Sequence, residues 1–85
     1  MLKVEIYTKN GCTYCDRAKQ LLEDKEVHFT EIRIDSNPDR IEEMLYRSRG
    51  MRSVPQIYIN DRLIGGFDDL VALDQAGKLD SMLSE

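Results

Sequence analysis

The feature that most constrains the fold is a pair of cysteines where two different residue patterns meet. Cys12 and Cys15 are the only cysteines in the 85-residue chain, and two residues separate them. The run before them alternates apolar and polar residues as a strand does, and the run from Thr13 onward repeats with helical spacing. A C-x-x-C pair at such a junction indicates a thiol–disulfide redox site.

This junction also suits the chemistry of a reactive thiol. At the start of a helix, Cys12 would lie beside free backbone N–H groups and the positive end of the helix dipole. Lowering a thiol pKa from ~8.5 to ~5 takes about 5 kcal/mol, and the dipole supplies at most ~2. Hydrogen bonds and cations must supply the remainder, and Lys9 and Arg17 are the nearest cations, unless both are only solvated surface charges. We expect Cys12 to attack and Cys15, which heads the apolar stripe of the helix, to resolve.

Strand and helix patterns alternate along the rest of the chain. Strand patterns cover residues 4–8, 29–34, 54–59 and 62–64, and helix patterns begin at residues 13, 38 and 69. We expect Asn37 to cap the second helix and Asp68 or Asp69 to cap the third, and residues 79–83 to add a last turn. The charged run 47–52 is expected to be solvated. The order β-α-β-α-β-β-α predicts an α/β, thioredoxin-like fold, a four-stranded mixed sheet flanked by helices on both faces.

Composition narrows the range of functions. The length predicts one domain, residues 1–85. Acidic and basic residues are interspersed around a net charge of −4, which argues against a nucleic-acid partner, and no apolar run is long enough to span a membrane. Without a signal-peptide pattern we expect a reducing cytoplasm, where paired cysteines are catalytic or bind metal. A closed metal site needs four ligands, so no metal is expected in a monomer with two thiols.

Three blocks of sequence together carry a resemblance to a known family. They are Lys9-Asn10-Gly11-Cys12-Thr13-Tyr14-Cys15, Ser53-Val54-Pro55-Gln56 and Gly65-Gly66-Phe67-Asp68-Asp69-Leu70. In this order they resemble the glutaredoxins of the thioredoxin-fold superfamily, and most of all the short bacterial dithiol class to which glutaredoxin 3 belongs.

The resemblance implies a binding site for glutathione, the co-substrate. Val54-Pro55 would form a cis peptide bond and present the Val54 backbone to the cysteinyl group, and Tyr14 would form the rim. Lys9 would contact the glycyl carboxylate, with Arg40 or Arg49 as candidates for a second cation. The γ-glutamyl end would lie on the segment Gly66, Phe67, Asp68 and Asp69, since a helix start binds a carboxylate and an aspartate binds an ammonium group.

The chain departs from the family pattern at three positions. Thr13 stands where proline is usual, Ser53 where threonine is common, and Phe67 where cysteine or a small residue is frequent. Thr13 matters most, because it restores a backbone N–H near the sulfur and removes a rigid φ. The single histidine, His28, is expected to be a surface residue and not a general base.

The implied function is a glutathione-dependent thiol–disulfide oxidoreductase, monomeric and cytoplasmic. Its partners would be glutathione and proteins that carry disulfides or bound glutathione, with ribonucleotide reductase as one dithiol substrate. Two alternatives remain open. One is a glutaredoxin-like thioredoxin recycled by thioredoxin reductase. The other is a dimer in which two Cys12 thiolates and two glutathione thiolates hold an iron–sulfur cluster, which the loss of proline at Thr13 would permit.

Overall fold

A four-stranded mixed sheet carries helices on both faces in the computed structural model, which describes residues 1–84. The elements in chain order are β1 (Val4–Thr8), α1 (Thr13–Asp24), β2 (Thr30–Arg33), α2 (Arg40–Ser48), β3 (Gln56–Ile59), β4 (Arg62–Gly65), α3 (Phe67–Gln75) and α4 (Leu79–Leu83). The strand order is β2-β1-β3-β4, with β1 and β2 parallel and the other pairs antiparallel. This arrangement confirms the predicted thioredoxin-like α/β fold.

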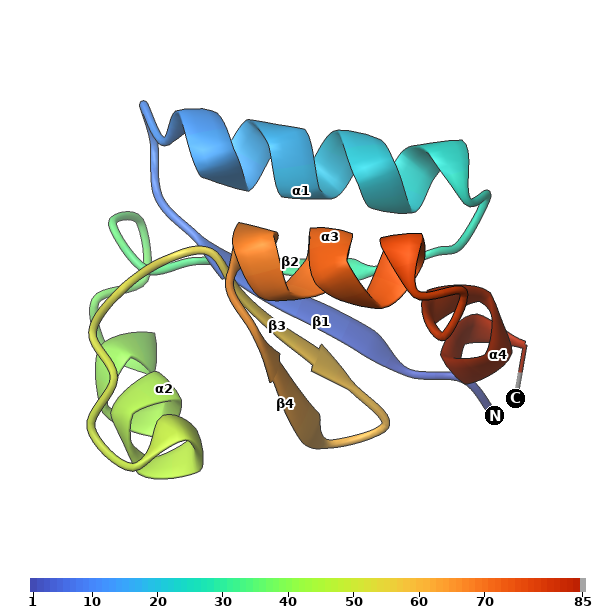
Figure 1. Cartoon of the computed structure of the whole chain (residues 1–85). Helices are drawn as coiled ribbons and strands as arrows, with labels where there is room; N and C mark the ends of the chain where they lie inside the picture. The colour runs from blue at the N-terminus through green and yellow to red at the C-terminus, as the bar shows by residue number, and fades with distance from the viewer. Residues whose placement is uncertain (85) are drawn as a thin grey trace.

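Side chains along the central strands point alternately to the two faces of the sheet, so the core consists of two clusters, one on each face. Ile6 and Ile57 face α1 and α3, which lie together on one side of the sheet in Figure 1. Tyr7 and Tyr58 face the opposite side, where they pack with Met44 of α2. Because successive side chains of a strand point to opposite faces, β3 is buried along its whole length and anchors both clusters.

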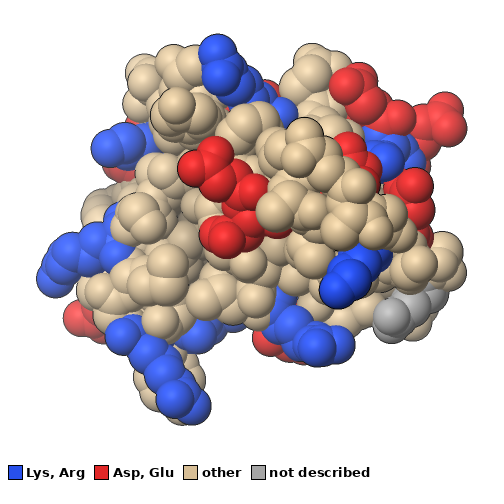
Figure 2. Space-filling view, in the orientation of Figure 1, with Lys and Arg blue, Asp and Glu red and all other residues tan. Residues whose placement is uncertain are grey.

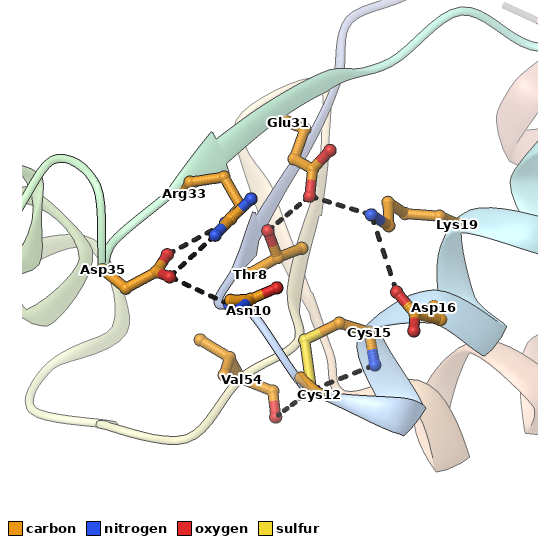
Figure 3. The surroundings of a disulfide bond; sticks show 10 residues. All are labelled: Thr8, Asn10, Cys12, Cys15, Asp16, Lys19, Glu31, Arg33, Asp35 and Val54. Carbon is orange, nitrogen blue, oxygen red and sulfur yellow. Dashed lines mark hydrogen bonds and ion pairs between the residues drawn. A yellow bond between two sulfur atoms is a disulfide. The ribbon is translucent and has the colours of Figure 1, made fainter.

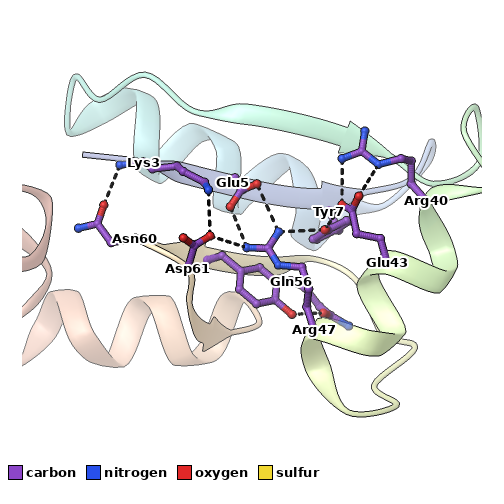
Figure 4. Close-up of polar contacts among 10 residues, drawn as sticks. Lys3, Glu5, Tyr7, Arg40, Glu43, Arg47, Gln56, Asn60 and Asp61 are labelled. Atoms are coloured by element: carbon purple, nitrogen blue, oxygen red, sulfur yellow. Dashed lines mark hydrogen bonds and ion pairs between the residues drawn. The ribbon is translucent and has the colours of Figure 1, made fainter. Parts of the chain in front are cut away.

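A polar network fixes α2 against its face of the sheet (Figure 4). The guanidinium group of Arg47 donates to Glu5 at 2.8 Å and to the Tyr7 hydroxyl at 3.0 Å, and it lies 4.0 Å from the centre of the Tyr58 ring. The Tyr7 hydroxyl in turn donates to Glu43. Burial first, and then the hydrogen bond to Glu43, raise the pKa of Tyr7 to about 12.

This raised pKa predicts a loss of stability at alkaline pH. Below pH about 10 Tyr7 is neutral in both states, whereas between about 10 and about 12 only the unfolded chain ionises, which favours unfolding. We expect the free energy of unfolding to fall across this window, and to fall less steeply in Tyr7→Phe. Urea unfolding at several pH values measures the free energy of unfolding of both proteins. Tyr46→Phe is the control, because that side chain is 87% exposed, and a Tyr7→Phe variant with the wild-type slope would contradict the prediction.

Several predicted boundaries differ from the structure. The third strand begins at Gln56 and not at residue 54, and the fourth ends at Gly65 and not at residue 64. The second strand is shorter, Thr30–Arg33, and α2 begins at Arg40, since the Asn37 side chain donates to the Arg33 carbonyl at 3.0 Å and closes a turn instead of capping the helix. The residue that caps α3 is Gly66, and not an aspartate. Within residues 1–84, no helix combines the length and apolar character needed to cross a membrane.

Candidate functional site

The two cysteines form a disulfide at the start of α1 (Figure 3), with 5.2 Å between their Cα atoms. Cys12 is the N-cap of the helix, and its sulfur accepts a hydrogen bond from the Cys15 backbone N–H at 3.1 Å. Cys15 is buried, with 1% of its surface exposed, whereas Cys12 is only partly buried. An incoming disulfide can therefore reach the sulfur of Cys12 before that of Cys15.

Side chains from the end of β2 and from the turn that follows it hold the loop that leads into the disulfide. Asp35 receives two hydrogen bonds from Arg33, at 2.9 and 2.7 Å, and one from the Asn10 backbone N–H at 3.1 Å. The Arg33 hydrogen bonds are the main reason that the pKa of Asp35 is lowered well below its usual range. Gly11 then turns the chain into the helix with a φ of +72°, a value that favours glycine.

A second set of polar contacts ties α1 to the sheet. Glu31 accepts a hydrogen bond from the Thr8 hydroxyl at 2.6 Å and from the Lys19 ammonium group at 3.0 Å. Burial opposes ionisation of Glu31, but these two hydrogen bonds outweigh it, so the pKa of Glu31 is lowered. The carboxylate thus links the end of β1 to the first turns of the helix that carries both cysteines (Figure 3).

A groove of about 330 Å³ opens beside the disulfide. Its lining residues are Tyr14, Met51, Ser53, Val54, Pro55, Gly66, Phe67, Asp68 and Asp69. The Val54–Pro55 peptide bond is cis, as the family resemblance implied. Cys12 is not itself a lining residue, but its sulfur lies 3.9 Å from the carbonyl oxygen of Val54, so it borders the groove.

Aromatic and acidic side chains form the wall that includes the start of α3. The rings of Tyr14 and Phe67 lie 5.8 Å apart, and the guanidinium group of Arg17 lies 5.6 Å from the centre of the Tyr14 ring. Arg17 therefore supports the rim of the groove. Asp68 and Asp69 are both exposed, and Asp69 accepts a hydrogen bond from the Gly66 N–H at 3.0 Å. Figure 2 shows acidic side chains near the centre of this face, where α3 begins in Figure 1.

The structure brings most of the predicted binding residues together, although they come from three separate blocks. Seven line the groove: Tyr14, Val54, Pro55, Gly66, Phe67, Asp68 and Asp69. Lys9 is exposed in the loop before Cys12 and is not among the lining residues. Of the two candidates for a second cation, Arg40 pairs with Glu43 at 2.9 Å, and Arg49 is exposed at the C-terminal end of α2.

Sequence reasoning assigned no binding role to two of the lining residues, Met51 and Ser53. They lie in the irregular segment between α2 and β3, where periodicity gives no signal. Ser53 belongs to the second block of the family resemblance, and for Met51 only its closeness to this block in the chain could have drawn attention to it. Among residues 1–84, no three His, Cys, Asp or Glu side chains gather into a set that could hold a metal ion.

Comparisons with known proteins agree with this arrangement. A family model for glutaredoxins matches residues 4–64. Glutaredoxin 3 of Escherichia coli K12 is 55% identical over 83 residues, which cover 98% of this chain and 99% of that protein. A glutaredoxin of Pseudomonas aeruginosa is 52% identical over 84 residues, 99% of each chain.

Solved structures extend the likeness to the fold. A complex of buckwheat glutaredoxin with glutathione superposes with a TM-score of 0.86 at 32% identity, covering 98% of this chain and 77% of that one. The solution structure of a Brucella melitensis glutaredoxin superposes with a TM-score of 0.82 at 48% identity, covering 98% of this chain and 89% of that one. With its C-x-x-C disulfide at the start of α1, its cis Val54–Pro55 bond and these matches, the chain belongs to the glutaredoxin family of thiol–disulfide oxidoreductases.

Proposed function

We propose that this glutaredoxin uses glutathione to reduce protein disulfides and mixed disulfides between proteins and glutathione. The observation that carries the proposal is the groove beside the partly buried Cys12, with the Val54 carbonyl 3.9 Å from its sulfur. A tripeptide thiol that lies in this groove can place its sulfur next to Cys12. The buckwheat glutaredoxin, similar over 98% of this chain, forms a complex with glutathione, which supports the same ligand here.

The polar groups of the groove suit the two ends of glutathione. At the start of α3, backbone N–H groups and the positive end of the helix dipole favour the γ-glutamyl carboxylate. Asp68 is exposed beside them and can pair with the γ-glutamyl ammonium group, whereas Asp69 is engaged with the Gly66 N–H. Lys9 is the proposed partner of the glycyl carboxylate, because its side chain is exposed in the loop before Cys12.

In the proposed reaction, the thiolate of Cys12 attacks the glutathione sulfur of a protein–glutathione mixed disulfide. The new bond is Cys12–S–S–glutathione, and the bond that breaks releases the protein thiolate, which takes a proton from solvent. A second glutathione thiolate then attacks the glutathione sulfur on Cys12, so that oxidised glutathione leaves and the Cys12 thiolate is restored. Attack is favoured when the nucleophile is ionised, and a thiol of low pKa also leaves readily.

Cys15 provides a second route. Its sulfur already bonds to that of Cys12 in the structure, so attack by the Cys15 thiolate on Cys12 can expel a bound thiol and form this disulfide. Reduction of a protein disulfide, which needs two electrons and two thiols, would follow this route. A dithiol substrate such as ribonucleotide reductase would be reduced by this route through Cys15. Glutathionylated proteins would be reduced by the first route, in which a second glutathione resolves the intermediate.

The test compares two sources of electrons for the same oxidised protein. One assay couples the protein to glutathione, glutathione reductase and NADPH, and the other couples it to thioredoxin reductase and NADPH. We expect turnover of a glutathione mixed disulfide in the first assay, with saturation in glutathione, and background rates in the second. Turnover with thioredoxin reductase alone would favour the glutaredoxin-like thioredoxin and overturn the proposal.

A further inference from the structure

One wall of the groove is formed by a segment that belongs to no helix or strand. Met51 and Ser53 line the groove from the connection between α2 and β3, and Met51 is 40% exposed. The chain reverses just before them, because Arg49 has a φ of +60° and Gly50 a φ of +101°. A segment of this kind has no regular ladder of backbone hydrogen bonds, so other groups must fix the position of its backbone.

Two buried side chains hold both backbone polar groups of Met51. The hydroxyl of Ser48 accepts the Met51 N–H at 3.0 Å and lies 3.2 Å from the Met51 carbonyl oxygen. The side-chain amide of Gln56 donates to the same carbonyl at 2.7 Å. Gln56 is completely buried and Ser48 is 7% exposed, so water does not compete strongly for these bonds.

The side chain of Gln56 is itself held by a neighbour on the same face of β3. Its side-chain oxygen accepts a hydrogen bond from the Tyr58 hydroxyl at 3.2 Å, and the Tyr58 ring lies under the Arg47 guanidinium group at 4.0 Å. Figure 4 shows Gln56 close to the network that holds α2 on the sheet. The wall of the groove is therefore connected, through two side chains of β3, to the polar network that holds α2 on the sheet.

We propose that Gln56, with Ser48, is a positioning residue that holds the Met51–Ser53 wall in place and so sets the affinity for glutathione; the inference rests on the proposed function. Neither residue lines the groove, so each acts through the Met51 backbone. Gln56 follows the cis Val54–Pro55 bond directly, and it thus links the two segments of this wall.

The test uses Gln56→Met, which keeps an unbranched side chain of similar size and removes both polar atoms. We expect KM for glutathione to rise about fivefold with kcat little changed, the loss expected for one uncharged hydrogen bond. The rate at which dithiothreitol reduces the Cys12–Cys15 disulfide should stay at the wild-type value, because that step needs no groove. Ser48→Ala should act in the same direction, and Ser48→Thr, which keeps the hydroxyl, should restore the wild-type KM.

Ile59→Val is the matched control for a general loss of stability. Ile59 lies on the same strand and is 2% exposed, but it packs in the cluster on the opposite face of the sheet. It should lower stability and leave KM unchanged. A rise in KM in Ile59→Val as large as in Gln56→Met would show that stability alone controls binding, and would overturn the inference.

Hydrogen exchange separates the failure of this inference from the failure of the proposed function. The Met51 amide should exchange about tenfold faster in Ser48→Ala and Gln56→Met, whatever ligand the groove binds. An unchanged exchange rate at Met51 would show that the two side chains do not hold the wall. Faster exchange with an unchanged KM would show that the wall does not set the affinity. If the wild type shows no saturation in glutathione, the proposed function fails, and exchange at Met51 still decides whether Gln56 positions the wall.

Discussion

Cys12→Ser should reduce the turnover of a glutathione mixed disulfide by roughly a thousandfold or more, to the rate of glutathione alone. The reason is that a serine hydroxyl cannot replace a thiolate in thiol–disulfide exchange, and losing a covalent nucleophile costs other enzymes up to about 10⁶ in rate. Cys12 is the partly buried N-cap of α1, and its sulfur already accepts the Cys15 N–H at 3.1 Å. The measurement is the glutathione-coupled assay with purified variants.

Cys15→Ser is the matched variant, and it should behave differently. Cys15 is 1% exposed, so a substrate does not reach its sulfur directly. We expect Cys15→Ser to keep turnover of the glutathione mixed disulfide within about threefold of the wild type, because a second glutathione resolves the intermediate. Reduction of a protein disulfide, which proceeds through the Cys12–Cys15 disulfide, should be lost. Retained turnover in Cys12→Ser, or its loss in Cys15→Ser, would reverse the assignment of the two thiols.

Gly65→Ala should destabilise the protein by about 2–4 kcal/mol and weaken glutathione binding as well. Gly65 has a φ of +122°, a conformation that residues with a Cβ rarely adopt. A Cβ at this position would lie 2.2 Å from the Asp69 carboxylate oxygen and 2.7 Å from its Cγ. The carboxylate must move away, so the hydrogen bond from the Gly66 N–H to Asp69 would be lost together with the shape of the groove. Urea unfolding and titration with glutathione measure the two effects.

The neighbouring glycine gives the control. Gly66 has a φ of −95°, and a Cβ there would meet only the Pro55 carbonyl oxygen, at 3.5 Å. Gly66→Ala should therefore cost much less stability than Gly65→Ala. In an Asp69→Ala background the contacts with the carboxylate are absent and only the 3.0 Å contact with the Cβ of residue 69 remains, so Gly65→Ala should cost less than in the wild type. The remaining cost reports the strained φ and that one contact. Equal costs in both backgrounds would show that Asp69 is not displaced.

Short-range patterns made much of this protein predictable. The alternation of residues 4–8 indicated β1 with its observed bounds, and the helical spacing indicated the start of α1 at Thr13. The same reasoning gave the element order and the two-sided sheet. The helical spacing also placed Cys12 at the start of the helix and Cys15 on its buried stripe. Such patterns depend on residues within one or two turns of each other, so the sequence displays them directly. The cis Val54–Pro55 bond came from the family resemblance, because few X–Pro bonds are cis.

Only the tertiary structure decided which distant groups meet. The Val54 carbonyl is 42 residues from Cys12 in sequence, and it still borders the reactive sulfur. Arg47 belongs to a charged run that was expected to be solvated, and it pairs instead with Glu5 of β1, on the face of the sheet that α2 covers. Met51 lines the groove, and its backbone is bonded to the side chains of Gln56 and Ser48. Single hydrogen bonds and ion pairs between distant segments repeat with no period along the chain, so these contacts exist only once the sheet has brought the segments together.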